Sequence, residues 1–250
     1  KCIDGGSDIG KFMAKNIREH GGVIHRNTEV KRIVVEDGKV SYVETADGSK
    51  VHGKNFISNM HPVRTLDMTE SNLIKQAYKH RVKSLENSIG GFVVNIVFEK
   101  NTYPYIKNNF YYIKDGQEWN LTEYNDETWP SCYAVFCSAS SKSPDYAESM
   151  TLLAYMKFDE VKQWADTFNT VSKEEDRGKD YEAFKKIKAE KLLSLVEERF
   201  PGVRKAIKSY YTATPLSYRD YIGNDDGSMY GIAKDYSNPL KTFISPRTKI

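Results

Sequence analysis

The sequence predicts an α+β protein, in which antiparallel strands and helices occupy separate stretches of the chain. Two observations lead to this class. Within the first sixty residues, three β segments are separated by Asp37-Gly38 and Asp47-Gly48, dipeptides that favour tight hairpin turns. Later in the chain, residues 181–200 repeat apolar side chains with the 3.6-residue period of a long amphipathic helix.

The first elements are a helix and a meander. Ser7 and Asp8 are suited to begin a helix, and Gly21-Gly22 ends it, because glycine takes the left-handed conformation at low cost. Its apolar residues recur at steps of three and four: Ile9, Phe12, Met13 and Ile17. Val23-Ile24-His25 is predicted to be a short strand. The meander follows, with strands predicted at residues 29–36, 39–45 and 50–58.

A second, mainly antiparallel sheet is expected further along the chain. Residues 68–88 are helical or irregular in pattern. The alternating apolar residues Phe92, Val94, Ile96 and Phe98 then begin strands predicted at 91–100, 109–114, 132–138 and 150–158. Pro201-Gly202 ends the long helix, whose apolar positions are Tyr181, Phe184, Ile187, Leu192, Leu195 and Val196. Residues 209–250 are expected to form ordered loop with short strands.

Composition excludes several classes of function. Lys and Arg total 37 against 34 for Asp and Glu, without a basic patch, so nucleic acid is not an expected partner. No apolar run approaches the ~18 residues of a transmembrane helix, so the protein is expected in the cytoplasm, with peripheral membrane contact left open. The five histidines and three cysteines have no metal-ligand or disulfide spacing. Cys132 and Cys137 are expected on opposite faces of one strand.

Two blocks of sequence have the residue order of a known family. The first runs from Gly5-Gly6 through the helix, Gly21-Gly22, Asn27-Thr28-Glu29-Val30 and the meander to Phe56-Ile57-Ser58-Asn59. The second comprises Thr214-Pro215-Leu216, Tyr218-Arg219-Asp220-Tyr221, Gly227-Ser228-Met229-Tyr230-Gly231 and residues 244–250. Together they resemble the phytoene desaturase, carotenoid isomerase and retinol saturase (all-trans-retinol 13,14-reductase) branch of the amine-oxidase-like flavoproteins.

The resemblance implies a parent protein with an α/β FAD/NAD(P)-binding fold, of which this chain is an internal piece. No G-x-G-x-x-G fingerprint occurs here, and the family places that motif before, and a further flavin contact after, the matching region. Residues 1–60 are then a remnant of the FAD-binding domain, residues 61–222 the substrate-binding domain, and residues 223–250 a return segment. FAD is expected in the full-length parent and none on this chain alone, and the use of NAD(P) stays open.

The resemblance also implies positions for cofactor and substrate. Val30, where the strand enters the meander, matches a backbone contact with the adenine end of FAD, and Glu29 and Asn59 are weaker candidates beside it. Tyr230 and Gly231 are expected to face the flavin, because glycine lets a planar ring approach the backbone.

Substrate contacts are predicted for Tyr218 and Tyr221, and for Phe92 and Val94, whose alternation is equally typical of a protein core. No residue is identified as catalytic.

The implied activity is that of an FAD-dependent oxidoreductase acting on carbon-carbon double bonds of a hydrophobic isoprenoid such as a carotenoid or retinoid. Saturation, desaturation and isomerisation share this framework, so the reaction type stays open. The alternative is a flavin-free binding module for a lipid or other hydrophobic ligand.

Overall fold

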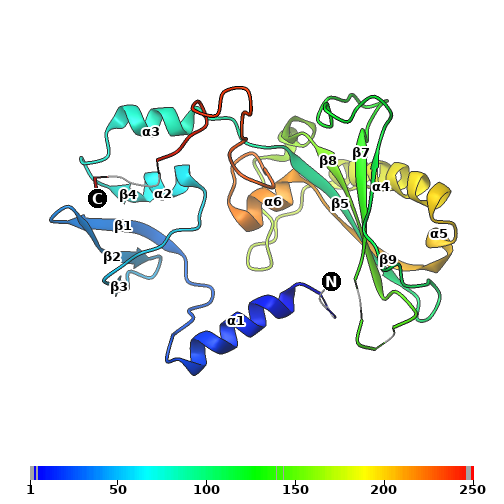
Figure 1. Ribbon diagram of the computed structural model, residues 1–250, viewed down its shortest axis with the longest axis horizontal. Coiled ribbons are helices and arrows are strands. Elements are labelled where there is room, and N and C mark those ends of the chain that lie inside the picture. Colours follow the sequence, from blue (N-terminus) through cyan, green and yellow to red (C-terminus); the bar gives the residue numbers. More distant parts are fainter. Residues whose placement is uncertain (1–2, 4, 139, 143, 246–248) are drawn as a thin grey trace. The chain divides into compact units, whose positions relative to one another are not determined.

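The computed structural model describes residues 3, 5–138, 140–142, 144–245, 249 and 250. It confirms the α+β class, with one mixed and one antiparallel sheet (Figure 1). The chain divides into two compact units. The larger unit takes the described residues of Lys1–His20 and Ile89–Met229, and the smaller unit takes those of Gly21–Ser88 and Tyr230–Ile250. Each unit is described separately below.

The smaller unit contains the predicted meander. Its elements are β1 (Val30–Glu36), β2 (Lys39–Thr45), β3 (Lys50–His52), α2 (Pro62–Met68), β4 (Thr69–Glu70) and α3 (Gln76–Lys83). The strand order is β3-β2-β1-β4, with antiparallel pairs along the meander and a parallel pair between β1 and β4. Asp37 and Gly38 both have positive φ, 50° and 76°, as the hairpin prediction requires.

Two strand predictions in this unit are wrong. Residues Val23-Ile24-His25 form no strand, and Val23 is 74% exposed. A strand needs a neighbour that completes its backbone hydrogen bonds, and none pairs with these residues in the part of the chain that the structure describes. The third strand of the meander ends at His52 and does not reach Ser58.

The larger unit is built on a five-stranded antiparallel sheet. Its strands are β5 (Gly90–Phe98), β6 (Phe110–Ile113), β7 (Cys132–Cys137), β8 (Ser149–Met156) and β9 (Ile207–Ala213), in the order β6-β7-β8-β5-β9. Its helical elements are α1 (Ser7–Glu19), the 3-10 turns η1 (Phe158–Glu160) and η2 (Lys162–Trp164), α4 (Lys179–Arg199), α5 (Val203–Ala206) and α6 (Pro215–Ile222). Helix α1 has the predicted bounds, but none of its residues is buried.

Helix α4 packs on one face of this sheet and forms the main core (Figure 1). Leu192, Leu193 and Val196 are at most 1% exposed there. The prediction for Ile187 is wrong, because that side chain is 68% exposed while its neighbour Lys188 is 6% exposed. The Lys188 ammonium lies 2.6 Å from Glu160 and over the Trp129 ring, so its charge is paired inside the unit.

The residues after β9 form a helix and not a loop. Thr214 accepts a hydrogen bond from the Leu216 amide, and Ser217 reaches back to the Thr214 amide, which together make a capping box. Pro215 occupies the first helical turn, where its missing N–H costs nothing. These signals begin α6, the helix that carries Tyr218 and Tyr221.

The two cysteines of β7 lie on opposite faces, as predicted. Both are free thiols, with Cys137 in the core and Cys132 half-buried. Cys2 and residues 246–248 of the second sequence block lie outside the described residues.

Candidate functional site

The beginning of β5 meets the loop that follows α6. A side chain at Gly90 would place Cβ 2.9 Å from the Gly227 carbonyl oxygen, and one at Gly91 would lie 2.8 Å from Met229 Sδ. The Met229 amide donates to the Ile89 carbonyl at 3.2 Å. The segment that resembles the family's approach to the flavin therefore packs directly on the glycine pair of β5.

Ser228 gives this loop an unusual polar group. Its hydroxyl is fully buried and has no hydrogen-bond partner within the described part of the chain. Its amide is held by Asp226 and its carbonyl oxygen by Asn224. A buried hydroxyl without a partner costs free energy in the folded state.

The two faces of the five-stranded sheet differ in what covers them. Cross-strand partners share a face, and Val93 pairs with both Leu153 and Ala213, while Leu153 also pairs with Ala134. None of these four residues belongs to the core beneath α4. They form the second face of the sheet, here called the open face because it lies away from the core beneath α4. Its apolar side chains lie next to Gly91 and Met229, with Val93 and Ala134 buried and Leu153 and Ala213 half-buried.

The open face changes character along the strands. Toward the other end of β5, Thr151 donates to Asn95 at 3.0 Å, and Tyr211 is 67% exposed. These residues continue the same face, since Asn95 pairs with Thr151 and Tyr211. The open face is thus apolar beside the Gly227–Met229 loop and mixed at its far end, where Phe136 pairs with Thr151.

The predicted substrate residues on β5 lie on the opposite face. Phe92 and Val94 are fully buried under α4, and Phe92 packs edge-on against Trp129 with 5.8 Å between ring centres. The neighbouring residues Gly91 and Val93 are the ones that belong to the open face. A role for Phe92 and Val94 in substrate binding stays a prediction.

Helix α6 is fixed by a buried ion network. Asp220 is fully buried and pairs with both Arg177 and Arg219. Asp220 also accepts from the Asn169 amide at 2.9 Å, and Arg219 donates to the Ala165 carbonyl oxygen at 2.6 Å. The network ties α6 to the loop of residues 165–177.

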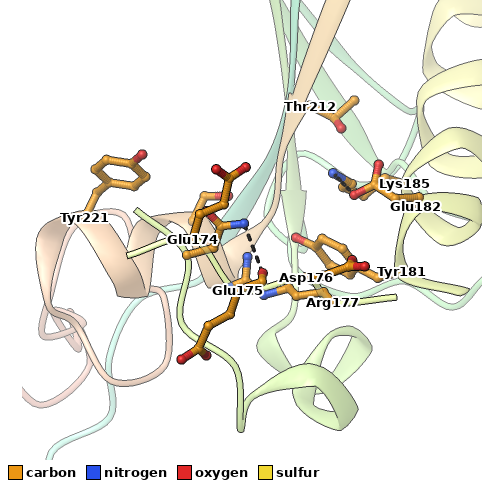
Figure 2. A pocket seen from close by; sticks show the side chains of 11 residues that line it. Glu174, Glu175, Asp176, Arg177, Tyr181, Glu182, Lys185, Thr212 and Tyr221 are labelled. Carbon is orange, nitrogen blue, oxygen red and sulfur yellow. Dashed lines mark hydrogen bonds and ion pairs between the residues drawn. The ribbon is translucent and has the colours of Figure 1, made fainter. Parts of the chain in front are cut away.

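The same loop and α6, together with α4 and β9, line a polar pocket of about 540 Å³ (Figure 2). Its labelled side chains include Glu174, Arg177, Tyr181, Lys185 and Tyr221. Burial raises the pKa of Tyr181, whose hydroxyl lies 2.9 Å from that of Thr214. The predicted substrate residue Tyr221 is 62% exposed at the rim of this pocket, and Tyr218 is half-buried on the same helix.

The predicted cofactor residues all lie in the smaller unit. Val30 begins β1 and is half-buried, and the Glu29 carbonyl oxygen accepts from the Ala46 amide at 2.8 Å. Tyr230 is 71% exposed, and Gly231 has a φ of 67°, a conformation that favours glycine. The contacts of Val30, Glu29, Tyr230 and Gly231 with FAD stay predictions.

Sequence reasoning passed over the charged residues of this region. Arg219 and Asp220 lie between the two predicted substrate residues of the Tyr218-Arg219-Asp220-Tyr221 motif. Arg177, which also pairs with Asp220, is 43 positions from Asp220 in the sequence. The adjacent opposite charges of Arg219 and Asp220 could have indicated an ion pair. The third member, Arg177, is too distant in sequence to be identified without the fold. Among the described residues, no group of three or more His, Cys, Asp and Glu is arranged to hold a metal ion.

No family model matches the chain. It is 26% identical over 235 residues to a prolycopene isomerase, chloroplastic, from Daucus carota, covering 92% of this chain and 35% of that protein. It is 20% identical over 249 residues to an all-trans-retinol 13,14-reductase from Danio rerio, covering 91% of this chain and 40% of that protein. These relatives bear names of the family that the sequence resembles, so the predicted resemblance is confirmed.

A solved structure supports the fold. An oxidoreductase from Methanosarcina mazei aligns with a TM-score of 0.52 and 18% identity, over 85% of this chain and 43% of its own. The chain therefore spans less than half the length of the relatives it matches. Within the described residues, none of the helices combines the length and apolar composition needed to cross a membrane.

Proposed function

We propose that the chain is part of an FAD-dependent oxidoreductase that acts on carbon-carbon double bonds of a hydrophobic isoprenoid, such as a carotenoid or retinoid. In this proposal, residues 61–222 supply the substrate-binding domain, and residues 1–60 and 223–250 belong to the cofactor side. The names of the relatives support the chemical class, although each name describes that relative alone. A cytoplasmic location, with or without peripheral membrane contact, is part of the same proposal.

The open face of the five-stranded sheet is the observation that carries the substrate class. Gly91, Val93, Ala134 and Ala213 give it a floor of small apolar groups, and Leu153 and Met229 stand above that floor. The half-buried side chains of this face, Leu153 and Ala213, gain free energy when a ligand removes their apolar area from water, at about 25 cal/mol per Å². The face offers no charge to a polar ligand. A flat, extended polyene matches both properties.

The cofactor residues fit a flavin in type and exposure. The largely exposed ring of Tyr230 can stack on a planar group, and Gly231 beside it has the positive φ that favours glycine. When bound, FAD would supply the hydride chemistry, while the protein binds and orients the substrate and excludes water. In this role Val30 and Glu29 would contact the nucleotide end. The use of NAD(P) and the reaction type both remain open in this proposal.

The test uses the full-length gene product. We expect a purified protein with flavin absorbance near ~450 nm and with saturable binding of all-trans-retinol as the probe. Replacing Leu153 by Glu, which puts a charge on the apolar end of the open face, should weaken retinol binding at least about tenfold. Replacing Tyr211, a 67% exposed side chain at the far end of the same face, by Glu is the matched control and should leave binding within about twofold.

The outcomes separate the two functions considered. A colourless protein that still binds retinol would favour the flavin-free binding module over an oxidoreductase. A flavoprotein whose affinity for retinol is unchanged by Leu153→Glu would contradict the proposal that the open face binds the substrate. For the 250-residue chain by itself, we expect no bound flavin.

A further inference from the structure

We infer that His61, acting through Asn87, is a positioning residue that fixes the Tyr230-Gly231 segment. The inference rests on the proposed function, in which these two residues face the flavin.

Two short segments hold Tyr230 and Gly231 in place. The Ser88 amide donates to the Gly231 carbonyl oxygen at 2.7 Å, and the Tyr230 amide donates to the Ser88 hydroxyl at 3.1 Å. Asn87 and Ile232 form an antiparallel bridge between them. Residues 86–88 and 230–233 thus form a two-stranded strap, in which the backbone of Tyr230-Gly231 is held by Ser88 on the other strand.

His61 connects this strap to the start of α2. The Val63 amide donates to His61 Nδ1 at 3.3 Å, and His61 Nε2 lies 2.9 Å from Asn87 Oδ1. Because Nδ1 accepts a hydrogen bond, the neutral ring carries its proton on Nε2, which then donates to Asn87. One imidazole therefore caps α2 with one nitrogen and holds the strap with the other.

Two more contacts limit where the strap can move. The His61 ring lies against Gly231, since a Cβ there would be 3.5 Å from His61 Cδ2. Ile232 is 8% exposed in a small cluster with Leu66 of α2 and Val82 of α3. Tyr230, by contrast, is largely exposed. The fold thus fixes the backbone of this segment on both sides while leaving the tyrosine ring free for a ligand.

The two nitrogens can be tested separately. Asparagine at a helix N-cap accepts a bond from the first turn, so His61→Asn keeps the contact with Val63 but is too short for Asn87. His61→Gln is long enough to donate to Asn87. By exchange of backbone amides with D2O in the isolated chain, we expect His61→Asn to speed exchange at Ser88 about tenfold and His61→Gln to keep it within about threefold. Exchange at Val94 in the larger unit should not change in either variant.

The full-length gene product supplies the functional arm. If His61 positions the flavin-facing segment, His61→Asn should shift the flavin absorbance and lower kcat more than it raises KM, and His61→Gln should restore both. Unchanged Ser88 exchange in His61→Asn would overturn the inference, and so would a flavin spectrum and kcat equal to those of the wild type. A wild-type protein without flavin would instead defeat the proposed function, and Ser88 exchange would still decide whether His61 fixes the strap.

Discussion

Asp220 carries its charge where water cannot reach it, since its side chain is fully buried between two guanidinium groups. Removing one member of a buried pair leaves the partner charge uncompensated, which typically costs about 3–5 kcal/mol. We therefore expect Asp220→Asn to lower the free energy of unfolding of the larger unit by about that amount, measured by urea titration. Glu198→Gln, at a 69% exposed side chain, is the control and should change it by less than about 0.5 kcal/mol. Equal effects of the two substitutions would contradict the buried network.

Tyr103 gives the protein a dependence on alkaline pH. Burial raises the pKa of its hydroxyl to about 12 from an ordinary value of 10.0. Between these two values the unfolded chain loses this proton while the folded chain keeps it, so the free energy of unfolding falls as pH rises. Below pH ~10 the residue adds no such dependence. Relative to that of the wild type, the free energy of unfolding of Tyr103→Phe should therefore rise by about 1 kcal/mol between pH 8 and pH 11. Urea titrations that give the same difference at both pH values would contradict the assignment.

Strand β5 shows how much a sequence pattern can say at the scale of one element. The alternation of Phe92, Val94, Ile96 and Phe98 correctly predicted a strand, because every second side chain of a strand points to the same face. The pattern alone did not say which face met α4. Both faces of this strand are apolar near its start, where Val93 is 8% exposed. Only the packing of α4 separates the core face from the open face.

In helix α4 the sequence pattern predicted the element correctly but not which of its residues are buried. Its periodicity correctly predicted a long helix, yet Ile187 is exposed and Lys188 is buried. Hydropathy places lysine in water, but here Glu160 and the Trp129 ring compensate its charge. Glu160 lies 28 positions away in sequence, so local periodicity contains no information about that pairing.

The glycine pair at the start of β5 allows a test of the loop contact. A methyl group at Gly90 would meet the Gly227 carbonyl oxygen and the Pro215 ring, each at 2.9 Å, and neither can rotate away. At Gly91 the nearest atom is Sδ of the flexible Met229 side chain. We expect Gly90→Ala to cost about 1–3 kcal/mol and Gly91→Ala less than about 1 kcal/mol in thermal or urea unfolding. The reverse order would show that the Gly227–Met229 loop does not rest on β5.

For the molecule as a whole, the sequence led to the family more directly than to the site. The resemblance came from glycine pairs, turns and strands in a fixed order, features that depend on local backbone chemistry. The open face, the ion network of Asp220 and the contacts of His61 each join residues far apart in sequence. They depend on tertiary packing, which propensity and periodicity do not encode, so the structure was needed to identify them.

The division into two units predicts how the chain unfolds. The larger unit has an extensive buried core, whereas the described residues of the smaller unit form a small cluster of buried apolar side chains, Leu66, Ile74, Val82 and Ile232. Units with separate cores open with separate free energies, and mutations without shared contacts act independently. Leu192→Ala in α4 should lower protection against amide exchange in the larger unit by about 2–5 kcal/mol, while the meander strands β1 and β2 keep theirs. Val82→Ala should do the reverse, with a smaller cost of about 1–3 kcal/mol. Amide exchange measured by mass spectrometry on peptides from both units tests this independence. If the two units shared one cooperative core, either substitution would lower protection equally in every peptide.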